Sequence, residues 1–266
     1  MTKMEQAAED INTLGRFCGK RDLPALTRDA LREAYGISRA DVMVLFGGSI
    51  LCGGDVLAEA MQNNIAETYV IVGGAGHTTE TLRKKMHAAY PEIETDGLPE
   101  AKVFEAYLEY RYSLKADFLE CESTNCGNNI TFLLRLLEEK HIPYSSIILA
   151  QDATMQRRME AGLRKYAPDA RIINYAVYAA QVAAAPDGLV YKNEIRDMWD
   201  MERYITLLMG EIPRLCDNAD GYGPKGKGFI AHVDIPDETI EAFGRLKMEY
   251  GGMIREANPL FASADI

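Results

Sequence analysis

The chain has 266 residues, of which 47% are hydrophobic and 26% charged, and this composition is typical of a globular protein that buries a full core. Its formal net charge of −11 would repel nucleic acid and anionic membrane surfaces, so we expect neither as a main partner. Five cysteines without a CxxC pair argue against a disulfide framework or a zinc site.

The start of the chain, MTKMEQAAED, is polar and acidic, which is unlike a signal peptide. The longest mostly apolar run, residues 177–185, is far too short to span a bilayer. We therefore expect a protein of the reducing cytoplasm, without a membrane anchor.

Residues 1–36 are predicted to form two helices, because Ile11, Leu14 and Cys18 recur at helical spacing. From residue 41 onward the pattern changes to short runs that are apolar on both faces and end at glycine or polar residues, as in the strands of a buried parallel sheet. These runs are residues 42–46, 69–72, 117–120, 146–150 and 171–175.

Helical patterns alternate with the predicted strands and occupy residues 55–63, 78–90, 128–140 and 154–166. A further helix over residues 99–113 is predicted as an insertion. Strand and helix in alternation indicate right-handed βαβ units. The predicted fold is therefore α/β, a Rossmann-like parallel sheet of about five strands with helices on both faces.

The remainder of the chain is predicted to be a long helix over residues 194–215, a glycine-rich and proline-rich loop at 217–229, a last helix at 237–250 and an irregular end. The sequence does not indicate an oligomeric state. The chain is predicted to divide into three segments. The segments are an N-terminal helical segment (1–36), a Rossmann-like domain (37–210) and a small, mostly helical C-terminal segment or lid (211–266).

Two predicted strands end in glycine-rich turns, where backbone N–H groups can approach a phosphate or carboxylate and the next helix N-terminus adds a favourable partial charge. Because ligands of such sheets bind outside the carboxyl ends of the strands, we expect a small anionic or nucleotide-like ligand there. The alternative is tight turns alone, since Thr79 stands where the GxGxxG fingerprint has its third glycine. The candidate ligand-binding residues of the two turns are Gly47, Gly48, Ser49, Gly73, Gly74, Ala75, Gly76, His77 and Thr78.

A polar stretch from Glu122 to Asn129 follows the third predicted strand and opens a helix. Glu122 could hold a ribose diol or an amino group, and Asn125 and Asn129 could orient the ligand. The alternative is an elaborate helix cap. Cys126, at the helix start, is interpreted as a small buried thiol rather than a reactive one.

The fourth predicted strand ends at Gln151 and Asp152, which are candidates for ligand binding. The guanidinium of Arg157 could reach back to a bound anion, or could instead form a structural ion pair. Arg158 is expected to face solvent or an acidic neighbour. The candidates for a catalytic role are His77, Glu122 and Asp152, and no metal site is predicted.

In these residues the chain resembles the domain-of-unknown-function family that includes YdcF, SanA and ElyC, over roughly residues 38–200. Gly47-Gly48 and Gly73-Gly74 match the glycine pairs that end the first two strands of that family. Departures are found in its Asn-Thr-x-Glu-Asn motif, where Cys126 and Asn128 replace the threonine and glutamate, and in its Thr-Ser-x-x-His-x-x-Arg motif, where only Arg157 matches well. The positions of that second motif's threonine and histidine are occupied by Ala150 and Thr154.

The resemblance implies a Rossmann-like domain and, for YdcF-like members, S-adenosyl-L-methionine as the ligand. We therefore expect an S-adenosyl-L-methionine-binding protein, and possible use of that ligand in transfer to an unknown acceptor. Two alternatives stay open. One is a phosphoryl or nucleotide hydrolase or transferase, for which Asp55, Glu122 and Asp152 would have to converge. The other is a non-enzymatic ligand sensor.

Overall fold

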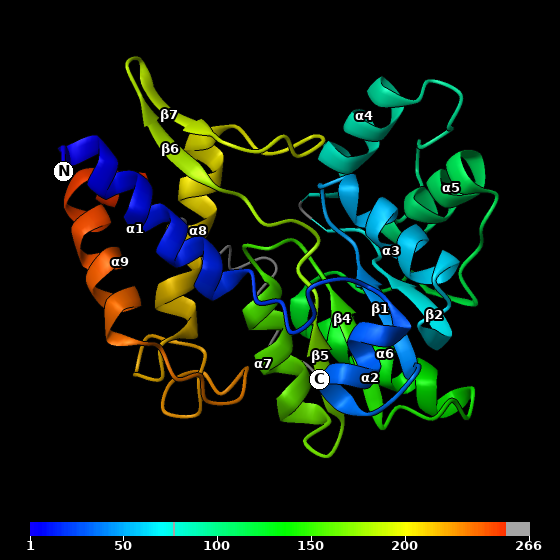
Figure 1. Cartoon of the computed structure of the whole chain (residues 1–266). Helices are drawn as coiled ribbons and strands as arrows, with labels where there is room; N and C mark the ends of the chain where they lie inside the picture. The colour runs from blue at the N-terminus through cyan, green and yellow to red at the C-terminus, as the bar shows by residue number, and fades with distance from the viewer. Residues whose placement is uncertain (77, 254–266) are drawn as a thin grey trace.

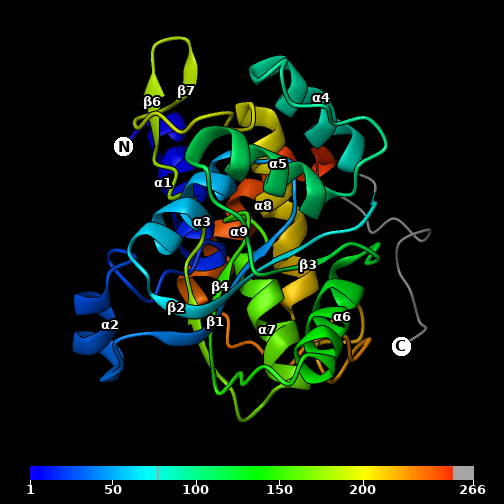
Figure 2. The ribbon, with the colours of Figure 1, turned by 90° about the vertical axis from the view of Figure 1, so that its right-hand side faces the viewer.

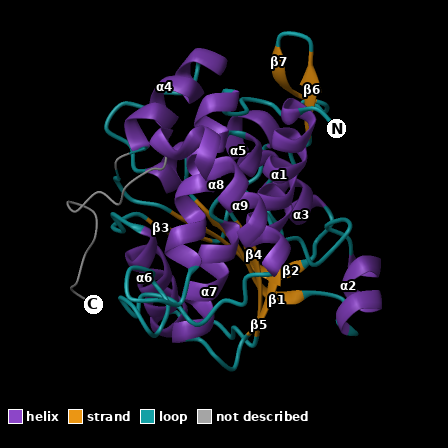
Figure 3. Ribbon diagram, turned by 90° about the vertical axis from the view of Figure 1, so that its left-hand side faces the viewer, coloured by secondary structure: helices purple, strands orange, loops and turns teal. Residues whose placement is uncertain are grey.

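A five-stranded parallel sheet forms the centre of the protein, whose computed structural model describes residues 1–76 and 78–253 (Figure 3). Every pairing within the sheet is parallel, and the strand order is β3-β2-β1-β4-β5. The predicted α/β fold is thereby confirmed. The strands are β1 (Ala40–Phe46), β2 (Ala66–Val72), β3 (Phe118–Glu120), β4 (Ser146–Ala150) and β5 (Arg171–Asn174).

Helices cover both faces of the sheet, with further helices beside it (Figures 1 and 2). Their bounds lie within a few residues of the predicted ones for most of the chain. They are α1 (Lys3–Cys18), α2 (Arg28–Tyr35), α3 (Cys52–Gln62), α4 (Thr79–Ala89), α5 (Glu100–Tyr112), α6 (Cys126–Glu139), α7 (Gln156–Tyr166), α8 (Met201–Leu215) and α9 (Asp237–Tyr250), followed by the 3₁₀ turn η1 (Gly251–Met253).

The two faces of the sheet bury separate sets of side chains, because successive residues of a strand point to opposite faces. In β1, Val42, Val44 and Phe46 join the core under α6 and α7, whereas Met43 and Leu45 join the larger core on the other side. This double burial explains why the strands appear in the sequence as continuous apolar runs.

Strand β1 lies at the point where the strand order reverses, with β2 on one side and β4 on the other. Chain connections leave the carboxyl ends of β1 and β4 in opposite directions, which opens a crevice between them. This topological switch point is where ligands of open α/β sheets bind, and it positions the candidate site described below.

A β-hairpin that the sequence analysis did not predict projects from one end of the molecule (Figure 1). It consists of β6 (Val182–Ala185) and β7 (Gly188–Tyr191), and Gly188 adopts a φ of 139° in the turn, which a residue with a side chain rarely adopts. The Asn12 side chain anchors the hairpin to α1 by bonding both the N–H and the carbonyl of Val182.

The N-terminal and C-terminal helices share the larger core with the sheet. Helix α1 lies along α9 and α8, and Arg245 of α9 pairs with the buried Asp10 of α1 at 2.7 Å. Helix α8 runs unbroken across residues 210–211, where the sequence analysis drew a segment boundary.

The long helix predicted over residues 194–215 begins only at Met201, because residues 192–200 are held in an irregular path. Asp200 caps the helix by accepting a hydrogen bond from the N–H of Arg203 at 2.7 Å. Upstream, Arg196 pairs with Asp55 of α3 at 2.6 Å, and Lys85 of α4 donates to the carbonyl of Asp197 at 3.2 Å. This segment therefore bridges from the hairpin to α3 and α4, as Figure 1 shows.

Within residues 1–76 and 78–253, we find no helix with the combination of length and apolar character that crossing a bilayer requires.

Candidate functional site

A cleft opens at the carboxyl ends of β1, β2 and β4 and continues outward beside α7. We call its part at the strand ends the inner arm. The residues that line the inner arm are Gly47, Gly48, Ser49, Gly74, Gly76, Thr78, Glu100, Ser123, Thr124, Asn125, Cys126, Gly127, Asn128, Asn129, Gln151, Asp152, Thr154 and Trp199.

The glycines of the two turns have different structural roles. A Cβ at Gly74 would meet the carbonyl of Cys121 at 2.8 Å and press into the carbonyl of Ser123, so this position excludes any side chain. At Gly48, by contrast, the nearest heavy atom would be the amide oxygen of Gln151, at an ordinary 3.6 Å. Gly74 is therefore required by packing between β2 and the segment after β3, whereas Gly48 leaves open space that faces the cleft.

Glu100, the first residue of α5, places a buried carboxyl group between the two turns. A Cβ added to Gly47 or to Gly73 would lie only 2.9 Å from the Cβ of Glu100, so Glu100 leaves neither position room for a side chain. Its Oε1 accepts hydrogen bonds from the hydroxyls of Thr79 at 2.9 Å and Thr78 at 3.2 Å. Burial raises the pKa of Glu100, and these two hydroxyl donors act against that rise.

Asp152 supplies a second buried carboxylate at the end of β4. Its Oδ1 accepts from the N–H and the hydroxyl of Thr154 at 2.8 and 2.7 Å, and from the Tyr178 hydroxyl at 2.8 Å. Its Oδ2 accepts from the indole N–H of Trp199 at 2.9 Å. Four hydrogen bonds to one carboxylate fix its orientation in the cleft.

The start of α6 forms the wall opposite Asp152. Asn125 caps the helix, because its side-chain oxygen accepts from the N–H of Asn128 at 3.0 Å. Asn125 and Asn129 both line the cleft, as expected from the sequence. Cys126 was expected to be a buried thiol, but it is half-buried and lines the cleft too. The helix terminus adds a positive partial charge to this wall.

Several predicted site residues lie elsewhere. Glu122 is exposed and pairs with Arg135 at 3.1 Å, so it turns away from the cleft. Gly73 and Ala75 do not line it, the first because it is buried against Glu100 and the second because it faces solvent. His77 lies outside the described residues.

Arg157 also points away from the cleft, which corrects the expectation that it reaches the strand ends. Its Nε donates to the carbonyl of Phe17 at 2.6 Å, and its guanidinium carbon lies 4.4 Å from the centre of the Phe17 ring. Arg158 lines the cleft in its place and has the acidic neighbour expected for it, Glu211, with contacts of 2.5 and 3.1 Å. This pair is nearly buried, with side-chain exposures of 12% and 3%.

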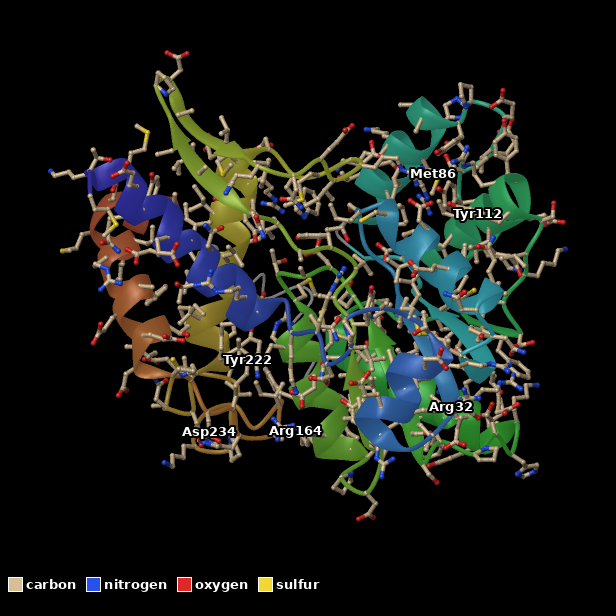
Figure 4. The ribbon with its side chains drawn as sticks, in the orientation of Figure 1. Arg32, Met86, Tyr112, Arg164, Tyr222 and Asp234 are labelled. Carbon is tan, nitrogen blue, oxygen red and sulfur yellow. The ribbon has the colours of Figure 1, made fainter. Side chains whose placement is uncertain are left out.

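Beyond Asp152 the cleft extends between α7 and α8, and we call this part the outer arm. Its lining is mostly apolar and aromatic, with three arginines. The outer arm consists of Ile130, Thr131, Met155, Arg158, Met159, Gly162, Tyr166, Arg203, Leu207, Arg214, Tyr222, Phe229 and Ile230. Tyr222 is labelled in Figure 4, above Arg164 and Asp234 in that view.

The carboxylates required by the hydrolase alternative do not converge. Asp55 accepts from the hydroxyls of Tyr107 and Tyr112 and pairs with Arg196, Glu122 faces solvent, and only Asp152 lines the cleft. In the part of the chain that the structure describes, no group of three or more His, Cys, Asp or Glu side chains is placed to hold a metal ion.

The most important residues that sequence reasoning missed are Glu100 and Trp199. Glu100 opens the helix that was interpreted as an insertion, where an acidic first residue is expected for helix stability alone. Trp199 was placed inside a predicted helix. A signal was nevertheless present, because Trp199 is the only tryptophan of the chain and directly precedes the helix-capping Asp200.

Comparison of the sequence with known proteins identifies a distant relative. No family profile matches the chain. The uncharacterized protein SCO4629 of Streptomyces coelicolor is 23% identical over 206 residues, an alignment that covers 77% of this chain and 80% of that protein. The relative's name carries no activity, so the function has to be argued from the cleft.

Proposed function

We propose that the protein binds S-adenosyl-L-methionine in the inner arm of the cleft. The observation that carries the proposal is the presence of two buried carboxyl groups, Glu100 and Asp152, beside a glycine-rich strand end and a helix N-terminus. A ligand that suits this set has a positive charge for the carboxylate, an anionic group for the N-terminus of α6 and a ring system for the apolar walls. S-adenosyl-L-methionine combines a sulfonium and an ammonium group with a carboxylate and an adenine.

The same observation weighs against a nucleoside polyphosphate. The carboxylate of Asp152 is fixed as a hydrogen-bond acceptor at the strand ends and would repel phosphate groups there. The resemblance of the glycine pairs and of Asn125 and Asn129 to YdcF-like proteins supports the proposal independently. Use of the ligand in methyl transfer would require mainly positioning of the two reactants, which a cleft with two arms can supply.

Thermal unfolding in the presence of different ligands tests the proposal. At about 100 times its dissociation constant, a ligand stabilises the native state by roughly 2.7 kcal/mol, and we expect this with S-adenosyl-L-methionine. S-adenosylhomocysteine, which lacks the sulfonium charge, should give a smaller shift, and ATP, NAD and phosphate should give less still. A shift with ATP or phosphate that exceeds the shift with S-adenosyl-L-methionine would favour the phosphoryl-transfer alternative and overturn the proposal.

A pair of variants at Gly48 places the ligand. Gly48→Asp adds a carboxylate to the open space between the turns and should abolish the stabilisation by S-adenosyl-L-methionine. Gly48→Ala is the matched control, because its Cβ meets only the Gln151 amide at 3.6 Å, and it should reduce binding little. Equal affinity in both variants would exclude the inner arm as the binding site.

A further inference from the structure

The outer arm runs along one face of a single helix, which forms much of its wall. The residues that α7 and its N-cap contribute are Met155, Arg158, Met159, Gly162 and Tyr166, which recur at intervals of three to four residues. At 1.5 Å per residue, the eleven residue steps from Met155 to Tyr166 extend over about 16 Å. A ligand that fills the arm is therefore elongated.

The facing wall is apolar as well. Leu207 of α8 and Ile230 contribute aliphatic side chains, and the rings of Tyr222 and Phe229 meet edge to face with centroids 5.2 Å apart. Phe229 is 38% exposed, so part of its ring is free at the end of the arm. An apolar body would bury this surface favourably.

The arginines of the outer arm are not equivalent. Arg158 is neutralised by Glu211, and Arg214 donates to the carbonyl of Gly210. Arg203, on the first turn of α8, lies with its guanidinium carbon 5.8 Å from the centre of the Trp199 ring, where the two arms meet. Within residues 1–76 and 78–253, Arg203 has no carboxylate in ion-pair distance. A positive charge is thus offered at the inner end of an apolar channel.

We propose that the outer arm binds the second substrate of the protein, an elongated apolar molecule with a single anionic group. The anionic group lies at Arg203, and the apolar body lies against Met155, Leu207 and Phe229. The description of this molecule as a second substrate rests on the proposed function, whereas the binding of such a molecule rests on the outer arm alone.

A chain-length series of alkyl carboxylates tests the proposal without S-adenosyl-L-methionine. Because Trp199 is the only tryptophan and lines the cleft, its fluorescence reports binding directly. From butanoate to octanoate, each added methylene should lower the dissociation constant by about fourfold. Octanoate should bind about tenfold more tightly than octanol, and octylamine more weakly than either. Affinity that is independent of chain length, or equal for octanoate and octylamine, would overturn the proposal.

Two variants separate the charge from the apolar wall. Arg203→Gln should weaken octanoate binding by about tenfold and leave octanol binding unchanged, since only the ion pair is lost. Phe229→Ala should weaken both probes by the same factor. The matched control is Arg32→Gln, an exposed arginine of α2 that is labelled in Figure 4 and lies outside the cleft. Unchanged octanoate affinity in Arg203→Gln contradicts the assignment of the anionic group.

The outcome also distinguishes this proposal from the proposed function. Length-dependent octanoate binding without any stabilisation by S-adenosyl-L-methionine would support the outer arm and overturn the inner-arm ligand. Stabilisation by S-adenosyl-L-methionine without octanoate binding would do the reverse.

Discussion

The indole N–H of Trp199 donates to Oδ2 of Asp152 at 2.9 Å, so a residue from the irregular segment before α8 is tied to the buried carboxylate at the end of β4. This contact joins the bridging segment, residues 192–200, to the end of β4. It also places the only tryptophan of the chain beside a carboxylate that lines the cleft.

The charge of Asp152 can be removed with little change of shape. Asp152→Asn can keep an oxygen toward Thr154 and Tyr178, but its amide then opposes the Trp199 N–H and leaves one buried donor unpaired. We expect a loss of about 2 kcal/mol in the free energy of unfolding. Calorimetric titration should show a drop of more than tenfold in affinity for S-adenosyl-L-methionine and little change for S-adenosylhomocysteine. Equal losses for both ligands would argue against recognition of the sulfonium charge.

The same substitution to alanine should destabilise the fold at Gly74 and leave its stability nearly unchanged at Gly48. Gly74→Ala forces a Cβ against the carbonyls of Ser123 and Cys121, and should destabilise the fold by about 3 kcal/mol. Gly48→Ala should change stability by less than about 0.5 kcal/mol. Urea unfolding of the two variants measures both values, and similar losses at the two positions would contradict the packing described for the turns.

The free energy of unfolding should depend on pH through Glu100, and the variant Glu100→Gln should lose this dependence. Burial raises the folded-state pKa of Glu100 above its ordinary value of 4.5, so the folded state binds more protons than the unfolded state in the window above pH 4.5. The contribution of Glu100 is therefore most favourable below this window and is lost as the pH rises through the raised pKa. Relative to the wild type, Glu100→Gln should gain stability as the pH rises above 4.5. Parallel stability profiles of the two proteins would rule out this titration.

Removing one partner of the Arg158–Glu211 ion pair should lower the free energy of unfolding much more than removing both. Arg158→Met leaves the buried carboxylate of Glu211 without its partner, and we expect a loss of about 3–5 kcal/mol. The double variant Arg158→Met/Glu211→Leu removes both charges and should recover most of that loss. Denaturant unfolding of Arg158→Met, Glu211→Leu and the double variant measures the coupling energy between the two side chains. Losses that simply add would show that the two side chains are not coupled.

The loop between α8 and α9 should open as pH rises above the pKa of His232. His232 contacts Asp217 at 2.7 Å and Asp234 at 3.0 Å, and hydrogen bonds to these carboxylates raise its pKa from 6.5. A raised pKa means that the stabilisation is complete below pH 6.5 and is lost as the pH rises through the folded-state value. Amide hydrogen exchange in residues 217–234 should accelerate over that range, after correction for intrinsic rates. His232→Gln should remove the dependence on pH, and persistence of the acceleration in this variant would assign it to another group.

Sequence patterns were sufficient for the sheet because its strands are buried on both faces and its helices are amphipathic. The glycine turns, Asn125, Asn129 and Asp152 were found by the same logic, since they directly follow strands. The direction in which a side chain points was harder to predict than the element that carries it. Arg157 and Arg158 are adjacent on α7, and only the packing of α1 and α8 around them decides which guanidinium meets Phe17 and which faces the cleft.

Residues that reach the site from distant segments could not be predicted from local patterns. The hairpin of β6 and β7 escaped notice because each strand has only four residues and β6, Val-Ala-Ala-Ala, has weak β propensity. Residues 194–200 have the composition of a helix, but Arg196 and Trp199 find partners on α3 and β4 that override this preference. Glu100 is likewise placed by α5 packing against both glycine turns.

The cleft draws its lining from residues spread between Gly47 and Ile230, across more than half of the chain. During synthesis the sheet is complete once β5 has emerged, some fifty residues before Phe229 and Ile230 close the outer arm. At translation rates of about 5–20 residues per second, the nascent protein therefore passes through an interval of seconds in which its Rossmann-like sheet exists without a complete outer arm. A ligand of the outer arm can therefore assist only the last stage of folding, and a chain that ends before Phe229 would carry the sheet but could not bind that ligand.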